Sequence, residues 1–289
     1  MRLTNEAAAT AARVLGKCCT EMKSRAPWRW NCAAQNGQHV SFDASVEEGF
    51  LQLSAGTSMC GLGGCDLDRA LLRNGTLSGG VKYVLDPSSH ELRLRADIVI
   101  VDELQLADRV RLGLVGLHQG HAQLDECAAS PAAAPRDHSL NSKAARLTQL
   151  LSESCWSFTE RSSNELAVSL RVDSAPPALI ATNGGGVELI LELVRCNSRE
   201  SLRLRAVSVF LLTANGNLRL ARASSSDRDG QRSFGFHVCL PASAVAEEVE
   251  HALSALSVAY RTCAREAAAL LDQRTAQYYL SAVGIEEGQ

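Results

Sequence analysis

The chain has few aromatic residues, no excess of positive charge and no hydrophobic run long enough to cross a membrane. Aromatic residues make up 4% of its 289 residues, and the formal net charge is −3. Nucleic-acid binding usually needs a basic stripe that neutralises phosphates, or aromatic residues set among basic ones for base stacking, and neither pattern is present. No stretch approaches the ~18 apolar residues of a membrane span, and Met1 to Gly16 carries Glu6 and no continuous apolar region. We therefore predict a cytoplasmic protein without nucleic-acid or membrane partners.

The sequence also lacks the short motifs that mark common catalytic sites. It contains no G-x-S-x-G nucleophile elbow, and Gly61 to Gly64 is not followed by the Lys-Ser/Thr of a phosphate-binding loop. Gly184 to Gly186 lies between two predicted strands, where such a run is typical of a hairpin connection. No catalytic residue is predicted, and we expect that the protein is not an enzyme, although catalytic groups can converge only in three dimensions.

Ten cysteines are present, but their spacing does not predict a metal site. No C-x2-C pair occurs, and Cys60 and Cys65 have no second pair or histidine cluster at zinc-finger spacing. His118 and His121 share one face of a predicted helix, but no carboxylate or thiol follows to complete a site. We interpret the histidines as a solvated pair and the cysteines as reduced thiols that pack as small hydrophobes, Cys239 in an apolar strand among them. No metal or other cofactor is therefore expected.

An order of elements that occurs twice is the most informative feature of the chain. Each half reads as a helix, several short strands and an amphipathic helix, and a Pro- and Ala-rich stretch separates the halves. The length fits two domains of about 100–200 residues each, and 46% hydrophobic with 21% charged residues is ordinary for a globular protein. We predict a domain at 1–126, a linker at 127–139 and a second domain at 140–289. The fold class is α+β, with two tandem domains, each a small antiparallel sheet flanked by an N-terminal and a C-terminal helix.

In the first half, hydrophobic periodicity and turn residues predict the following elements. They are a helix over Asn5–Lys23, strands over Trp28–Ala33, His39–Ala44 and Phe50–Ala55, a short helix over Asp66–Arg73, strands over Val81–Leu85 and Glu91–Val101, and a helix over Glu103–Gln123. In the strand from Glu91, apolar residues alternate with Glu91, Arg93, Arg95 and Asp97, which are expected to face water. Asp102 is the predicted cap of the last helix, whose apolar positions are Leu104, Ala107, Val110, Leu114 and Leu117.

The second half repeats this plan with more strongly patterned strands. The predicted elements are a helix over Ser142–Ser152, strands over Cys155–Glu160, Glu165–Val172, Leu179–Thr182, Val187–Cys196 and Leu202–Thr213, a hairpin at Asn215-Gly216 leading to a strand over Leu218–Ala221, a polar loop over Ser224–Gly230, a strand over Ser233–Leu240 and a long helix from Val245. The apolar stripe of that helix consists of Val245, Val249, Leu253, Leu256, Tyr260, Cys263, Ala267 and Leu270.

Three pairs of segments correspond between the halves. They are the meanders that start at Trp28 and Trp156, the turn-plus-strand segments Pro87–Ile100 and Asn215–Leu220, and the strand-then-helix endings Arg95–Leu117 and Phe234–Leu256. In pattern and order, nearly the whole chain resembles the specialised chaperones of type III secretion and the YbjN proteins that share their fold. The resemblance implies a non-enzymatic α+β protein whose apolar sheet and helix surfaces hold an extended peptide of a client protein. Such chaperones act as dimers of one domain, so a tandem copy resembles a dimer fused into one chain and implies a monomer.

The residues that would bind a client are not assigned by the sequence. Five apolar residues could form a binding face or could be buried in the core or between domains: Ile190, Val194, Val207, Val209 and Leu211. A main-chain edge that pairs with an extended peptide is the physical route that we expect. Two alternatives stay open, an interaction or immunity-type module that binds one folded partner, and an enzyme whose site is not visible in the sequence.

Overall fold

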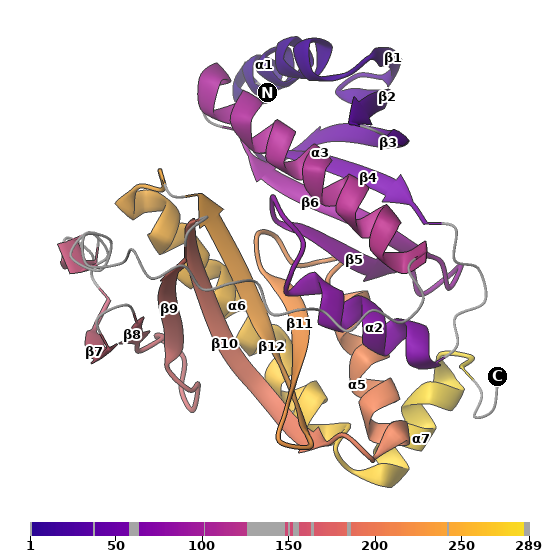
Figure 1. Cartoon of the computed structure of the whole chain (residues 1–289), viewed down its shortest axis with the longest axis vertical. Helices are drawn as coiled ribbons and strands as arrows, with labels where there is room; N and C mark the ends of the chain where they lie inside the picture. Colours follow the sequence, from indigo (N-terminus) through magenta and orange to yellow (C-terminus); the bar gives the residue numbers. More distant parts are fainter. Residues whose placement is uncertain are drawn as a thin grey trace. The chain divides into compact units, whose positions relative to one another are not determined.

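The protein divides into two compact units, Met1–Cys127 and Ala128–Gln289 (Figure 1). The computed structural model describes residues 2–36, 38–57, 64–100, 102–125, 148–149, 151–152, 156–162, 165–183, 186–241 and 243–285. The predicted linker at 127–139 lies outside these residues, as does most of the predicted helix Ser142–Ser152, of which 148–149 and 151–152 are helical.

The described residues of the first unit form a six-stranded antiparallel sheet with three helices. Its elements are α1 (Arg2–Cys18), β1 (Glu21–Ala26), β2 (Arg29–Asn36), β3 (Gln38–Glu47), β4 (Phe50–Gly56), α2 (Gly64–Asn74), β5 (Val81–Leu85), β6 (Leu92–Val99) and α3 (Glu103–Asp125). The strand order in the sheet is β1-β2-β3-β4-β6-β5. The last helix begins as predicted, because the Asp102 carboxylate accepts hydrogen bonds from the backbone N–H groups of Leu104 and Gln105, both at 3.0 Å.

The second unit is also a six-stranded antiparallel sheet, and its described helices follow the strands. Its elements are β7 (Phe158–Ser162), β8 (Glu165–Val168), β9 (Ala178–Asn183), β10 (Gly186–Asn197), α5 (Ser201–Ala214), β11 (Arg222–Arg228), β12 (Gln231–Pro241), α6 (Ala246–Ala269) and α7 (Gln273–Ala282). Its strand order, β7-β8-β9-β10-β12-β11, is the order of the first sheet. The prediction of an α+β fold with two sheet-and-helix domains is confirmed.

The core of the first unit lies between the sheet and α3. Along β6, the predicted apolar face is buried, with Leu92, Leu94, Ala96 and Ile98 all at most 4% exposed. Glycines on α3 let the helix backbone approach this face closely, since a Cβ at Gly113 would already lie 3.2 Å from the Ile98 side chain. Leu104, which the sequence placed on the buried stripe, is instead 77% exposed, whereas Leu106 in the same first turn of α3 is fully buried, so the buried face of the helix begins at Leu106.

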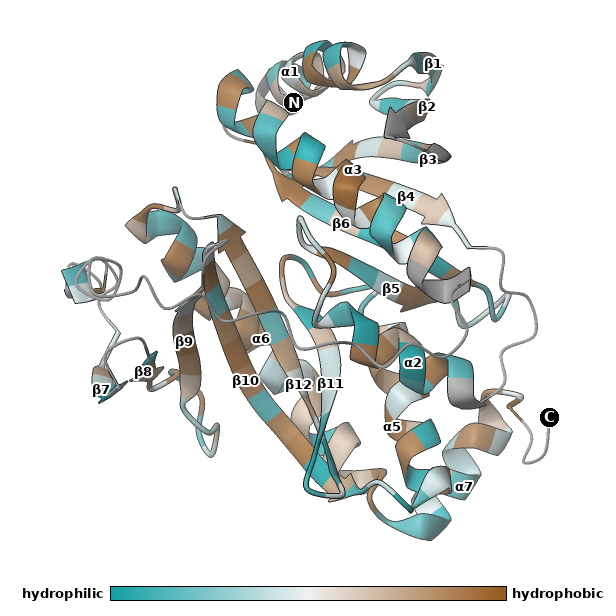
Figure 2. Cartoon of the chain, in the orientation of Figure 1, coloured by the Kyte–Doolittle hydropathy of each residue, from teal (hydrophilic) through white to brown (hydrophobic). Residues whose placement is uncertain are grey.

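The core of the second unit lies between its sheet and α6. β9 and β10 are coloured largely hydrophobic in Figure 2, and α6 packs on β10 and β12. Most of the predicted stripe of α6 is buried, and so is Leu270 beyond the end of the helix, but Tyr260 is only partly buried and Val245, the N-cap residue, is 51% exposed. β9 and β10 pair as the predicted hairpin, with Asn183 opposite Gly186, and Gly184 and Gly185 lie outside the described residues.

Several element predictions are wrong. The first helix ends at Cys18 rather than Lys23, and β1 follows, because Thr20 bonds through both its N–H and its hydroxyl to the Ala33 carbonyl oxygen and so draws the chain into the sheet. Residues 202–213 lie in helix α5 instead of a strand, residues 218–221 do not form the predicted strand, and residues 224–228 of the predicted loop 224–230 belong to strand β11. Alternation of Val207, Val209 and Leu211 favoured the strand, but these residues belong to a helix buried on several sides, which periodicity alone does not distinguish from a buried strand.

Candidate functional site

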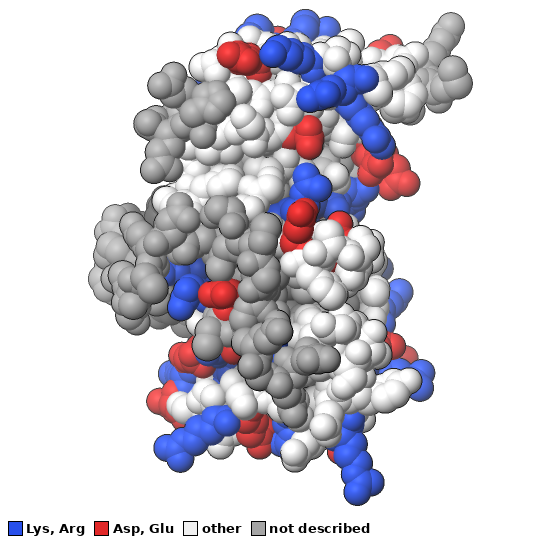
Figure 3. Space-filling model, turned by 90° about the vertical axis from the view of Figure 1, so that its right-hand side faces the viewer, with Lys and Arg blue, Asp and Glu red and all other residues white. Residues whose placement is uncertain are grey.

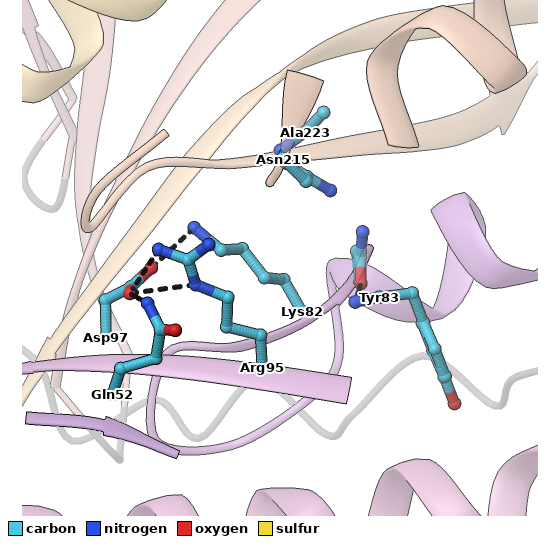
Figure 4. A network of polar contacts seen from close by, with 8 residues as sticks. Gln52, Lys82, Tyr83, Arg95, Asp97, Asn215 and Ala223 are labelled. Carbon is cyan, nitrogen blue, oxygen red and sulfur yellow. Dashed lines mark hydrogen bonds and ion pairs between the residues drawn. The ribbon is translucent and has the colours of Figure 1, made fainter. Parts of the chain in front are cut away.

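The first sheet carries a buried cluster of polar side chains on the face opposite its apolar residues. Lys82 on β5 places its Nζ 2.9 Å from Asp97 Oδ2, and the two side chains are each 1% exposed. Arg95 donates to Asp97 Oδ1 from Nε at 3.0 Å and from Nη2 at 2.8 Å, and Gln52 Nε2 donates to the same oxygen at 3.3 Å. Figure 4 shows these side chains converging on Asp97. The prediction that Asp97 faces water is wrong, since the cations beside it allow the carboxylate to be buried.

The charge of this cluster is set by two opposing effects on Asp97. Burial would raise the pKa of the carboxyl group, because a low-dielectric environment disfavours its charged form. Lys82 and Arg95 outweigh this effect through their charges and hydrogen bonds, and they lower the pKa of Asp97 to about 2. The carboxylate is therefore ionised at neutral pH, and its attraction to the two cations stabilises the fold.

The second sheet carries a different polar cluster on its corresponding face. Arg222 Nη2 donates to Cys239 Sγ at 3.0 Å, and His237 Nε2 lies 3.5 Å from the same sulfur. Glu188 Oε1 lies 3.9 Å from His237 Nε2. Burial, and then the charge of Arg222, lower the pKa of His237 to about 3, so the imidazole is neutral at neutral pH. The interpretation of Cys239 as a small hydrophobe in an apolar strand is wrong, because it shares the polar face of β12 with His237.

The two clusters occupy equivalent register positions in the two sheets. In the first sheet, Lys82 pairs with Arg95 and Gln52 pairs with Asp97. In the second sheet, Arg222 pairs with His237 and Glu188 pairs with Cys239. Because the strand orders agree, the same four positions hold a buried ion pair in one unit and a carboxylate, imidazole and thiol beside a guanidinium in the other.

A second equivalence lies at the end of the helix that precedes β5 and β11. The buried side chain of Asn74, the last residue of α2, accepts from the Tyr83 N–H at 2.6 Å, and that of Asn215, after α5, accepts from the Ala223 N–H at 2.7 Å (Figure 4). The hairpin predicted at Asn215-Gly216 is therefore wrong, since Asn215 caps a helix. The dipeptide Asn-Gly occurs at both places, and this signal could have aligned Asn215 with Asn74 instead of with the turn at Pro87.

The two edges of each sheet differ in exposure. All six residues of β1 are exposed, as are four of the five residues of β7. At the opposite edges, four of the five residues of β5 are buried, and three of the first four residues of β11 are buried while its last three are exposed. β1 and β7 are therefore the more exposed outermost strands, and they stand at the same place in the strand order.

The residue pairs that the sequence singled out do not form a site in the described part of the chain. Cys60 and the side chain of Cys65 lie outside the described residues. His118 is buried, with Nδ1 2.7 Å from the Leu114 carbonyl oxygen one turn earlier, and His121 is half-buried. The prediction of a solvated histidine pair is wrong, because α3 turns this face towards the protein. Of the five candidate apolar residues, Ile190 is 41% exposed, whereas Val194, Val207, Val209 and Leu211 are buried.

Among the residues that the structure describes, no helix is long and apolar enough to cross a membrane. On the face drawn in Figure 3, Lys and Arg side chains are interspersed with Asp and Glu. This mixture agrees with the small net charge of the chain and does not form a basic stripe on that face.

Residues 143–269 match the sequence profile of the YbjN family, which is described as "Putative bacterial sensory transduction regulator". The matched residues extend from before β7 to the end of α6, so the second unit is YbjN-like. No curated protein matches the chain.

Proposed function

We propose that the protein is a non-enzymatic, chaperone-like protein that holds an extended segment of a client protein against an outermost strand of its sheet. The observation that carries this proposal is the exposure of β1 and β7, since at the other edges four of the five residues of β5 and three of the first four residues of β11 are buried. The outer edge of a sheet offers main-chain N–H and C=O groups to which an extended peptide adds as a further strand. The likeness of residues 143–269 to the YbjN family supports a regulatory or chaperone-like role.

The chemistry of β1 suits an extended client with alternating apolar residues. Met22 pairs with the buried Cys32, so it stands on the core side of the sheet, yet it is 38% exposed. An added strand would extend the core at this edge and cover Met22 with its own apolar side chains. Lys23 and Arg25 also lie on β1, and their positive charges oppose pairing between the β1 strands of two copies of the protein.

Trp28 adds a second apolar side chain in the turn between β1 and β2. This residue is 38% exposed. Its backbone has a φ of 60°, a conformation that is uncommon for a bulky residue. Its carbonyl oxygen accepts from the Val46 N–H at 3.0 Å, and this bond holds the turn on the neighbouring strand. A large aromatic side chain held at an accessible edge is the kind of anchor that peptide-binding surfaces use.

Site-specific crosslinking tests the proposal. A photoreactive amino acid placed at Met22 should crosslink a reduced, carboxymethylated test protein that cannot fold. The same group at Tyr278, which is 78% exposed on α7, is the control and should give little product. Equal product at the two positions, or no binding of the unfolded protein, contradicts the proposal. Binding of one folded partner at a fixed ratio instead would indicate the interaction-module alternative.

A pair of proline variants tests the role of the main-chain edge itself. Successive residues of an edge strand direct their N–H groups alternately towards the neighbouring strand and away from it. Of Lys23→Pro and Ser24→Pro, one variant should therefore lose a bond to β2 and unfold at lower temperature, while the other keeps its stability. The stable variant should bind the unfolded test protein more weakly, and unchanged binding by that variant would exclude pairing at β1.

A further inference from the structure

We propose that Glu188, His237 and Cys239 form a zinc-binding site on the second sheet. Their ligand atoms lie within 4.8 Å of one another, and a carboxylate, an imidazole and a thiolate are all ligands that zinc accepts in proteins. The spacing of these three residues along the chain matches no zinc-finger motif. The pairing of β10 with β12 brings Glu188 opposite Cys239, and strand alternation places His237 two residues away on the same face.

The distances fit a tetrahedral ion. With zinc–sulfur and zinc–nitrogen bonds of about 2.3 Å and 2.0 Å, a tetrahedral angle separates the two ligand atoms by about 3.5 Å. The separation of Cys239 Sγ and His237 Nε2 is 3.5 Å. Glu188 Oε1, at 3.9 Å from the imidazole nitrogen, is slightly too distant, but its side chain is 31% exposed and can rotate towards the ion. This exposure also gives the ion a path from solvent.

Arg222 is compatible with this role. Binding replaces the thiol proton of Cys239 with the metal, and the proton leaves to the buffer. The ligand set then carries two negative charges, from Glu188 and Cys239, beside the positive charge of Arg222. Hydrogen-bond donors to a metal-bound ligand orient it and tune its affinity for the ion, and the Arg222 donor, 3.0 Å from the sulfur, is placed to do so.

The equivalent cluster of the first sheet does not offer a metal site. Its carboxylate, Asp97, already faces the ammonium group of Lys82 at 2.9 Å and the guanidinium of Arg95 at 2.8 Å. These cations occupy the position in which a metal ion would have to approach the carboxylate.

Cobalt titration of the metal-free, reduced full chain tests the site, since tetrahedral cobalt bound by a thiolate gives a charge-transfer band and intense visible bands that zinc then removes. We expect about one equivalent of tightly bound cobalt. Cys239→Ala should abolish the charge-transfer band, whereas Cys263→Ala, which removes a buried thiol from α6, should leave it unchanged.

Glu188→Gln is the second variant, because a partly exposed residue can be changed without threat to the fold. It should weaken cobalt and zinc binding at least about tenfold while circular dichroism stays unchanged. A band of equal intensity in Cys239→Ala would show that other thiols of the chain bind the metal. That result, equal affinity in Glu188→Gln, or no metal uptake by the wild-type chain would overturn the proposal.

Discussion

Loss of one partner from the buried ion pair of the first sheet should destabilise the protein far more than loss of an exposed pair. Lys82 and Asp97 are each 1% exposed, and their charged atoms lie 2.9 Å apart. Removing one partner of a buried pair leaves a charge without its counterion and typically costs about 3–5 kcal/mol. Lys82→Met should reduce the free energy of unfolding by about 3 kcal/mol, near the lower end of this range, because Arg95 still neutralises the Asp97 carboxylate.

Urea unfolding followed by far-ultraviolet circular dichroism measures this cost. Arg111→Gln is the matched control, because it breaks an ion pair with Asp108 whose side chains are 67% and 68% exposed, and it should cost at most about 1 kcal/mol. The double variant Lys82→Met/Asp97→Leu removes both charges and should cost less than the two single changes added together. A cost for Lys82→Met no greater than that for Arg111→Gln would refute the assignment of Lys82 as the main counterion.

The pH dependence of stability gives an independent measure of the same pair. The pKa of Asp97 is lowered from 3.8 to about 2 in the folded protein, so the folded state favours the ionised carboxylate. The stability from this group is present above pH 4 and is lost as the pH falls towards 2, a loss of about 2 kcal/mol. The difference in unfolding free energy between the wild type and Asp97→Asn should shrink by that amount between pH 5 and pH 2. A constant difference would contradict a lowered pKa of Asp97 in the folded protein.

Three further changes are predicted, each measured by urea unfolding. Gly116→Ala should destabilise by about 1–3 kcal/mol, because its Cβ would overlap a backbone carbonyl, whereas Gly16→Ala, with open space around it in α1, should be neutral or stabilising by up to about 1 kcal/mol. Asn215→Ala should cost about 1–3 kcal/mol, because it leaves the buried N–H of the following strand without its acceptor. Cys239→Asp places a carboxylate beside Arg222, so it should reduce the free energy of unfolding much less than Val238→Asp, which places one on the buried apolar face. Equal reductions would show that the two residues are assigned to the wrong faces of β12.

The sequence predicted the elements whose pattern reports directly on burial. The alternation in β6 and the stripe of α6 match the buried faces because each is amphipathic, and a sheet or helix with one wet side leaves a period in the sequence. Helix α5 has no such wet side, since Ser201 is its only exposed residue, and the alternating pattern of its valines favoured a strand. Its length and the Asn-Gly at its end were the better signals.

The polar clusters could not be predicted from the sequence, because pairing between strands far apart in the chain creates them. Glu188 and Cys239 are neighbours only through the β10–β12 register. The charged residue Asp97 was expected in water, since a single strand shows its own alternation but not the lysine that the next strand places beside it. Only the strand order, which sequence patterns leave undetermined, joins these residues.

The equivalence of the two clusters separates what the fold requires from what each unit can do. The core faces of both sheets are apolar at matching positions, and a buried asparagine ties the preceding helix to the edge strand in both. The polar positions obey no such constraint, because a buried charge is tolerated wherever a counterion or ligand partner accompanies it. Asp97 meets this condition through Lys82, whereas the neutral thiol of Cys239 accepts a hydrogen bond from Arg222. The same scaffold can therefore hold a structural ion pair in one unit and a ligand set in the other, so the role of a position in the second unit cannot be transferred to the first by alignment alone.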